Sequence, residues 1–100
     1  MKFNNFGNNS QMQQMMKQAQ DMQKQLERAK SELAETAIEA SAGGGMVTVE
    51  ISGAYELLNL KIKPEAVDPD DVEMLEDLVI AAINEALNQV TKLREEKIPL

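Results

Sequence analysis

The middle of the chain alternates between apolar and polar residues in two short runs, residues 47–52 and 58–63. This two-residue period is typical of β-strands that have one buried face. The break between the runs, Gly53-Ala54-Tyr55, is short and led by glycine, so the two runs predict an antiparallel hairpin. Pro64 ends the second run because proline cannot donate a hydrogen bond to a strand ladder.

Residues 36–41 are compatible with either a last helical turn or a third strand. The glycines that follow, 43–45, are unfavourable in a helix, which favours a strand paired with residues 46–52. We therefore predict a three-stranded antiparallel sheet over residues 36–63. The three glycines lead into a strand and lack a following Lys-Ser/Thr pair, so we interpret them as a turn and not as a phosphate loop.

Residues 11–35 carry a helical period, with apolar residues at steps of three and four. We call this set the methionine stripe: Met12, Met15, Ala19, Met22, Leu26, Ala29 and Leu33. A stripe this narrow is typical of a helix that lies along one neighbour. Because methionine side chains adapt to many shapes, the stripe is also compatible with a groove for a partner protein.

Residues 68–97 predict a second, longer helix with a broader apolar face, which we expect to cover the sheet and to pack against the first helix. Asp68 and Pro69 are the expected N-cap and first helical residue. Residues 1–10, rich in Asn, predict a flexible arm. The sequence thus predicts a single α+β domain over residues 1–100: helix, small sheet, helix. Its core is small and poor in aromatic residues, which favours a homodimer.

The net charge of −7 is unevenly distributed, because residues 1–30 hold five basic and two acidic side chains. Lys17, Lys24 and Arg28 share one outward face of the first helix, and we call them the basic stripe. They form either an ordinary solvated face or a surface that meets phosphates. A second candidate patch, near the end of the last helix, consists of Lys92, Arg94 and Lys97.

The chain contains no His and no Cys, so the commonest general base and the thiol nucleophile are missing and an enzyme is not expected. The acidic residues from Glu65 to Asp77 are explained by capping of the second helix, and they lack the Gly and ligand spacing of a calcium loop. We predict no metal, no cofactor and no small-molecule substrate. No signal peptide or membrane-spanning run is visible, so we expect a cytoplasmic protein.

Four stretches, in this order, resemble the YbaB/EbfC family of bacterial nucleoid-associated proteins: residues 16–23, 44–49, 52–54 and 73–79. The resemblance implies a helix, a small antiparallel sheet and a C-terminal helix, in homodimers whose helical arms project like tweezers. It also implies DNA binding and a role in nucleoid organisation or gene regulation. The residues that contact DNA follow only from charge and placement, as the six basic side chains named above. The competing hypothesis is an assembly module that binds a protein through the methionine stripe and does not bind DNA.

Overall fold

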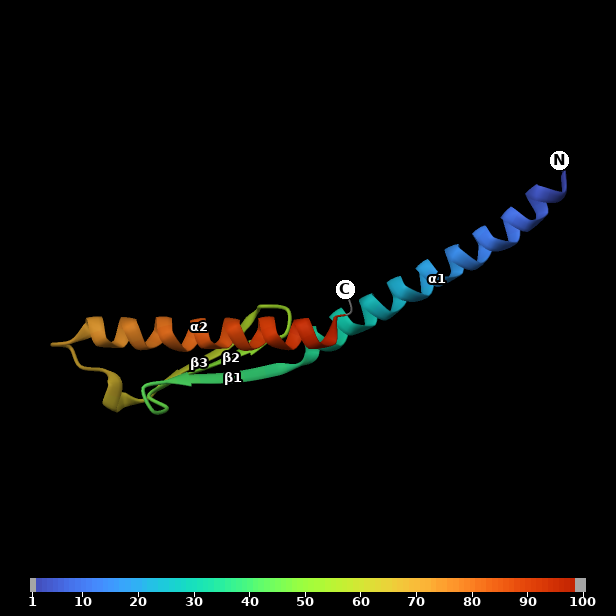
Figure 1. Ribbon diagram of the computed structural model, residues 1–100. Coiled ribbons are helices and arrows are strands. Elements are labelled where there is room, and N and C mark those ends of the chain that lie inside the picture. Colours follow the sequence, from blue (N-terminus) through green and yellow to red (C-terminus); the bar gives the residue numbers. More distant parts are fainter. Residues whose placement is uncertain (1, 99–100) are drawn as a thin grey trace.

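The computed structural model describes residues 2–98, with side-chain positions from Asn9 onward. It confirms the predicted α+β architecture (Figure 1). In chain order the elements are helix α1 (Lys2–Glu35), strands β1 (Ala37–Ala42), β2 (Val47–Ser52) and β3 (Leu57–Ile62), the short 3₁₀-helix η1 (Pro64–Ala66) and helix α2 (Val72–Lys97).

The three strands form one antiparallel sheet in the order β1-β2-β3, as the alternating pattern predicts. Val49 in the central strand pairs with Ala40 of β1 and with Leu60 of β3, so these three side chains share one face of the sheet. A bulge between Glu50 and Ile51 shifts the register of β3 near its start. Positive φ angles at Gly43, Gly44 and Gly45 allow the tight turn that joins β1 to β2.

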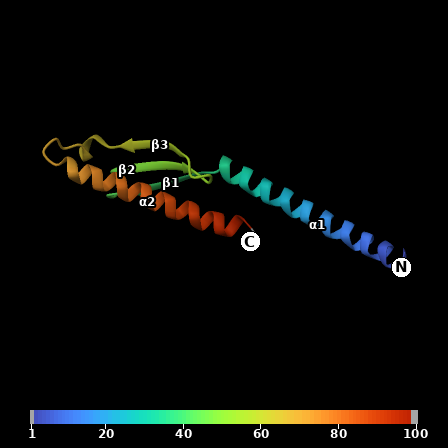
Figure 2. The same cartoon turned by 90° about the horizontal axis from the view of Figure 1, so that it is seen from above.

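The core lies between α2 and one half of the sheet. Helix α2 packs mainly against β1 and β2, while β3 is the edge strand farthest from the helix (Figure 2). Small side chains on α2 allow this close approach, because Ala82 and Ala86 are fully buried beneath the strands. The buried core residues are Ala40, Val47, Val49, Ile51, Ala82, Ala86 and Val90.

Helix α1 projects away from this body as a long arm (Figure 1). Our expectation that α2 covers the sheet is correct for β1 and β2 only, and the expectation that it also packs along the first helix is wrong. Only the base of α1 meets the rest of the chain, where Leu33 is 3% exposed. The physical reason is the connection: Thr36 alone separates α1 from β1, which leaves no loop for the helix to fold back.

Two element boundaries also differ from the prediction. Lys2–Ser10 belong to α1, so the prediction of a flexible arm is wrong for them, and Met1 lies outside the described residues. A helix that is already nucleated gains one hydrogen bond for each added residue, which offsets the weak helix propensity of Asn. Helix α2 begins at Val72 with Asp71 as its N-cap, so the predicted start at Asp68-Pro69 is wrong. The Asp68 side chain instead accepts a hydrogen bond from the Asp70 N–H in a preceding turn.

Candidate nucleic-acid interface

The basic stripe lies on the projecting part of α1, and all three of its side chains are exposed. Lys17, Lys24 and Arg28 are spaced by seven and four residues, so they stay within about 40° of one another around a helix of 3.6 residues per turn. The methionine stripe lies about 160° away on the same helix. The arm therefore carries cations on one side and apolar side chains on the other.

One acidic residue interrupts the basic stripe. Asp21 lies four residues after Lys17 and three before Lys24, on the same face of α1, and it is exposed. Its carboxylate offsets part of the positive potential of the two lysines. The charge along this face is therefore positive but weak.

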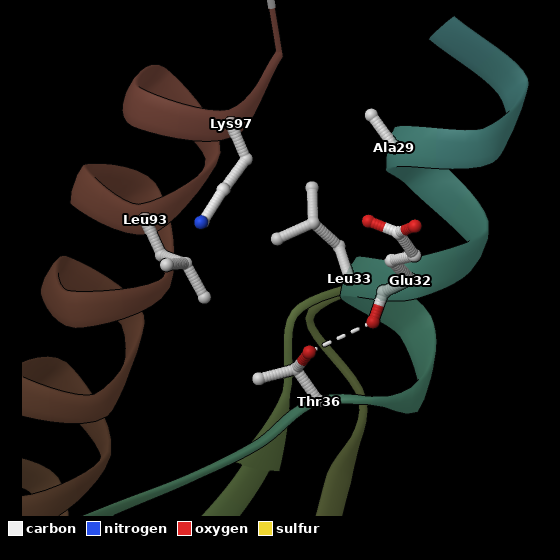
Figure 3. Close-up of a pocket in the computed structure, with 6 residues that line it drawn as sticks. All are labelled: Ala29, Glu32, Leu33, Thr36, Leu93 and Lys97. Carbon is white, nitrogen blue, oxygen red and sulfur yellow. Dashed lines mark hydrogen bonds between the residues drawn. The ribbon is translucent and has the colours of Figure 1, made fainter. Parts of the chain in front are cut away.

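The base of the arm rests directly on the turn between β2 and β3. The Gly53 N–H donates to the Thr36 carbonyl at 3.0 Å, and a Cβ at Gly53 would overlap the carbonyl group of Leu33. Thr36 Oγ1 donates to the Glu32 carbonyl at 2.7 Å, which closes the last turn of α1 (Figure 3). This glycine lets two backbone segments approach closely, and the contact sets the direction in which the arm leaves the body.

The same turn is fastened to α2 by three contacts. Arg94 donates from Nη1 to the Gly53 carbonyl at 2.9 Å, and its guanidinium lies 5.4 Å from the centre of the Tyr55 ring. The Tyr55 hydroxyl is hydrogen-bonded to Thr91 Oγ1 at 2.7 Å. These contacts hold Tyr55 in a left-handed conformation, with φ of 63°, which is unfavourable for a residue that has a side chain. We call this group the turn clamp: Gly53, Tyr55, Thr91 and Arg94.

The second predicted patch is not a continuous surface. Lys92 and Arg94 are two residues apart and point to opposite sides of α2. Arg94 is engaged in the turn clamp, while Lys97 lies beside the base of α1 (Figure 3). There it lines a cavity of about 340 Å³ together with Glu32 and Leu33. The end of α2 therefore does lie near the first helix, but Lys92 points away from the other two cations and Arg94 is held in the turn clamp.

The acidic residues before and at the start of α2 lie at the opposite end of the body from the arm (Figure 1). Helix α2 separates them from the base of α1 by 26 residues, or about 39 Å. This distance is several times the Debye length of about 8 Å at physiological salt. These acidic residues thus have little influence on the electrostatic potential at the basic stripe.

The turn clamp was missed in the sequence because it joins residues far apart in the chain. Arg94 and Gly53 are separated by 41 positions. The only local signal was the glycine-led break itself. Among the described residues, no group of three His, Cys, Asp or Glu side chains is placed to hold a metal ion. The described helices also include none that is long and apolar enough to cross a bilayer.

A model of the YbaB/EbfC DNA-binding family matches residues 8–99, which is nearly the whole chain. The chain belongs to the YbaB/EbfC family. The resemblance stated from the sequence is therefore confirmed. The family is defined by DNA binding and is not a class of enzymes.

Several curated relatives in this family are similar along most of their length. A nucleoid-associated protein of Moorella thermoacetica is 60% identical over 78 residues, covering 78% of this chain and 75% of the relative. One of Alkaliphilus metalliredigens is 53% identical over 85 residues, covering 85% and 75%. The crystal structure of the uncharacterized protein HP0035 from Helicobacter pylori has a TM-score of 0.75 at 25% identity, over 84% of this chain and 88% of that one. This chain is therefore a member of a DNA-binding family whose curated relatives are named nucleoid-associated proteins, and it has the fold described above.

Proposed function

We propose that this YbaB/EbfC protein binds duplex DNA as a homodimer, mainly through backbone phosphates, and that it acts in the nucleoid in organising DNA or regulating genes. The single observation that carries the proposal is the projecting helix α1, whose exposed basic stripe lies far from the acidic end of the body. Phosphate contacts are independent of base sequence, so we expect little sequence preference. We expect the protein to reside in the cytoplasm, at the nucleoid.

The dimensions of the basic stripe suit a run of phosphates. Lys17 and Arg28 are eleven positions apart, which is about 16 Å along a helix. Over that length one strand of B-DNA presents about five phosphates, so each of the three cations can meet a different one. Glutamine side chains beside the stripe, at Gln13, Gln14 and Gln20, are also exposed and can donate hydrogen bonds to phosphate oxygens. We assign Lys97 and Lys92 at most a supporting role and Arg94 mainly a positioning one, since its guanidinium is already bonded to Gly53.

We propose the homodimer because a large apolar face of the chain is exposed to solvent. Every residue of β3 is exposed, including Leu57 at 51%, Leu58 at 48% and Leu60 at 48%. Leu60 lies on the same face of the sheet as the buried Val49, but α2 does not reach far enough to cover it. Exposed apolar surface of this extent marks a contact with another protein.

The neighbouring side of α2 continues the same apolar face. Ile80 and Leu87 are 57% and 37% exposed, and they share one side of the helix with Ile83. Ile83 and the β3 leucines line a cavity of about 220 Å³ between helix and strand. A second copy can cover this face through a two-fold symmetric contact, in which the same leucines and isoleucines of both copies pack together. We call this surface the sheet-helix face.

DNA binding is tested by fluorescence anisotropy with a labelled random duplex, titrated at several salt concentrations. The variant Lys17→Ala/Lys24→Ala/Arg28→Ala should bind more weakly on every sequence. If each cation contacts one phosphate, the slope of log affinity against log salt concentration should be shallower in this variant. The expected change is about 2.7 for each arm that binds DNA. The double variant Lys61→Ala/Lys63→Ala, which removes charge from the sheet, should bind like the parent. An unchanged slope in the triple variant would refute the assignment of this stripe.

The dimer is tested by light scattering at micromolar concentration. The parent should have at least twice the monomer mass of 11.1 kDa. Leu60→Asp should lower the mass below that of the parent, because it would bury an unpaired carboxylate in the sheet-helix face. Lys61→Asp is the matched control, since Lys61 lies on the other face of β3 and should leave the dimer intact. A folded Leu60→Asp protein that keeps the mass of the parent would refute this interface.

A further inference from the structure

The methionine stripe is an apolar surface that the body of this chain does not cover over most of its length. Met12, Met15 and Met22 are 58%, 68% and 69% exposed, although they lie on a regular helix. Only the residues nearest the body are protected: Leu26 and Ala29 in part, and Leu33 almost fully. A long helix without a packing partner is marginally stable in water, so this stripe needs an occupant.

We propose that α1 binds the α1 of a second copy of this chain, antiparallel, through the methionine stripe. A heptad pattern of this kind pairs best with a helix that carries the same pattern, and the chain itself supplies one. This contact is separate from the sheet-helix face, and it does not depend on the proposed binding of DNA.

The sizes of the stripe residues favour the antiparallel arrangement. In antiparallel register, Met12 of one copy faces Ala29 of the other, Met15 faces Leu26 and Ala19 faces Met22. Each alanine is thereby opposite a methionine, so a small and a large side chain together fill the space between the two helices at these levels. A parallel pair would instead place Ala19 against Ala19 and Ala29 against Ala29, and it would leave gaps at both levels.

The residues beside the exposed part of the methionine stripe are uncharged, which also permits self-association. The positions that flank it on the free part of the helix are occupied by Gln11, Gln18, Gln25, Met16 and Gln23. None is charged, so two copies meet without like-charge repulsion. The basic stripe stays on the outer side of each helix, about 160° away from the contact.

The base of the arm provides space for the tip of another arm. Two open cavities flank the base, one of about 340 Å³ lined in part by Ala29 and one of about 380 Å³ lined in part by Leu26. In the antiparallel register these are the residues that face Met12 and Met15 of the second copy. A parallel pair would leave both cavities unfilled. The pair would also present a basic stripe on each of two opposite sides and so hold two DNA segments, a consequence that does rest on the proposed DNA contact.

The pairing is tested by disulfide cross-linking without DNA, since the native chain contains no cysteine. Proteins carrying Met15→Cys and Leu26→Cys should cross-link when mixed, because these positions face each other. Neither should cross-link alone, since identical positions lie about 16 Å apart along an antiparallel pair. A mixture of Lys17→Cys and Lys24→Cys, on the opposite face, is the control and should stay uncross-linked.

Adding Met12→Gln and Met22→Gln to both cysteine proteins should reduce the rate of cross-linking at least about tenfold, because two buried methionines are lost. These positions are exposed in the single chain, so its fold is preserved. Cross-linking of Met15→Cys alone would overturn the antiparallel register, and no cross-linking of the mixture would overturn the pairing. Anisotropy with DNA, measured on the same proteins, reports the proposed function separately.

Discussion

The contact between Gly53 and the base of α1 makes a quantitative prediction. Replacement of Gly53 by Ala would place a Cβ against the Leu33 carbonyl, which is backbone and cannot rotate away. The base of the arm must then shift, and the hydrogen bond from the Gly53 N–H to Thr36 weakens. Overpacking costs about 1–3 kcal/mol and a lost hydrogen bond about 1 kcal/mol, so we expect unfolding to become easier by about 2–4 kcal/mol.

Gly44→Ala is the matched control. A Cβ at Gly44 would meet nothing within 4 Å, but its φ of +66° is unfavourable for Ala. We therefore expect a cost of about 1–2 kcal/mol from the backbone alone, with no movement of the arm. Urea denaturation measures the free energy of unfolding for both variants.

The direction of the arm is measured by pulsed electron paramagnetic resonance between two spin labels. Gln18→Cys on α1 and Asn84→Cys on α2 are suitable positions because both are exposed and the chain has no other cysteine. Gly53→Ala should change the distance between the labels, and Gly44→Ala should leave it unchanged. If Gly53→Ala keeps both the parent stability and the parent distance, the β2–β3 turn does not orient the arm.

Three further outcomes follow from the structure. Asp21→Asn should raise DNA affinity in the anisotropy assay by removing the one carboxylate within the basic stripe, whereas Asp77→Asn, near the start of α2, should have no effect. Val90→Ala should lower the free energy of unfolding in urea by about 2–3 kcal/mol, because Val90 is fully buried against the sheet and its loss leaves a cavity. Arg94→Lys should lower the free energy of unfolding by about 1–2 kcal/mol, because lysine loses the hydrogen bond to Gly53 or the stacking on Tyr55. An unchanged free energy of unfolding would show that this guanidinium does not stabilise the turn clamp.

The parts of the fold that were predictable are those whose pattern is local. The alternation of Val47, Val49 and Ile51 with polar residues defines a strand whatever lies beside it. The last helix was predicted to end at residue 97, and it does so. Its start was not, because Asp68 and Asp71 are both good N-caps and the choice depends on how η1 places the chain.

Only part of the candidate site could be predicted from the sequence. The common face of Lys17, Lys24 and Arg28 follows from helical spacing, and the structure shows these side chains exposed on one face of a helix. The direction of that helix depends on a single linking residue, Thr36, and on close contact with a distant glycine, neither of which has a periodic signal. The same holds for Arg94, which was grouped with Lys92 by charge although the two point to opposite sides of α2.

The projecting arm also determines how this protein moves through solution. A compact chain of 100 residues has a radius of gyration of about 13 Å, whereas this one has 22.9 Å, with a longest dimension of 84 Å against 19 and 16 Å for the others. Friction depends on the longest dimension more than on mass. A single copy will therefore elute from a gel-filtration column earlier than a globular standard of 11.1 kDa, and it will be mistaken for an oligomer. Elution volume alone cannot count the copies in any assembly of this protein.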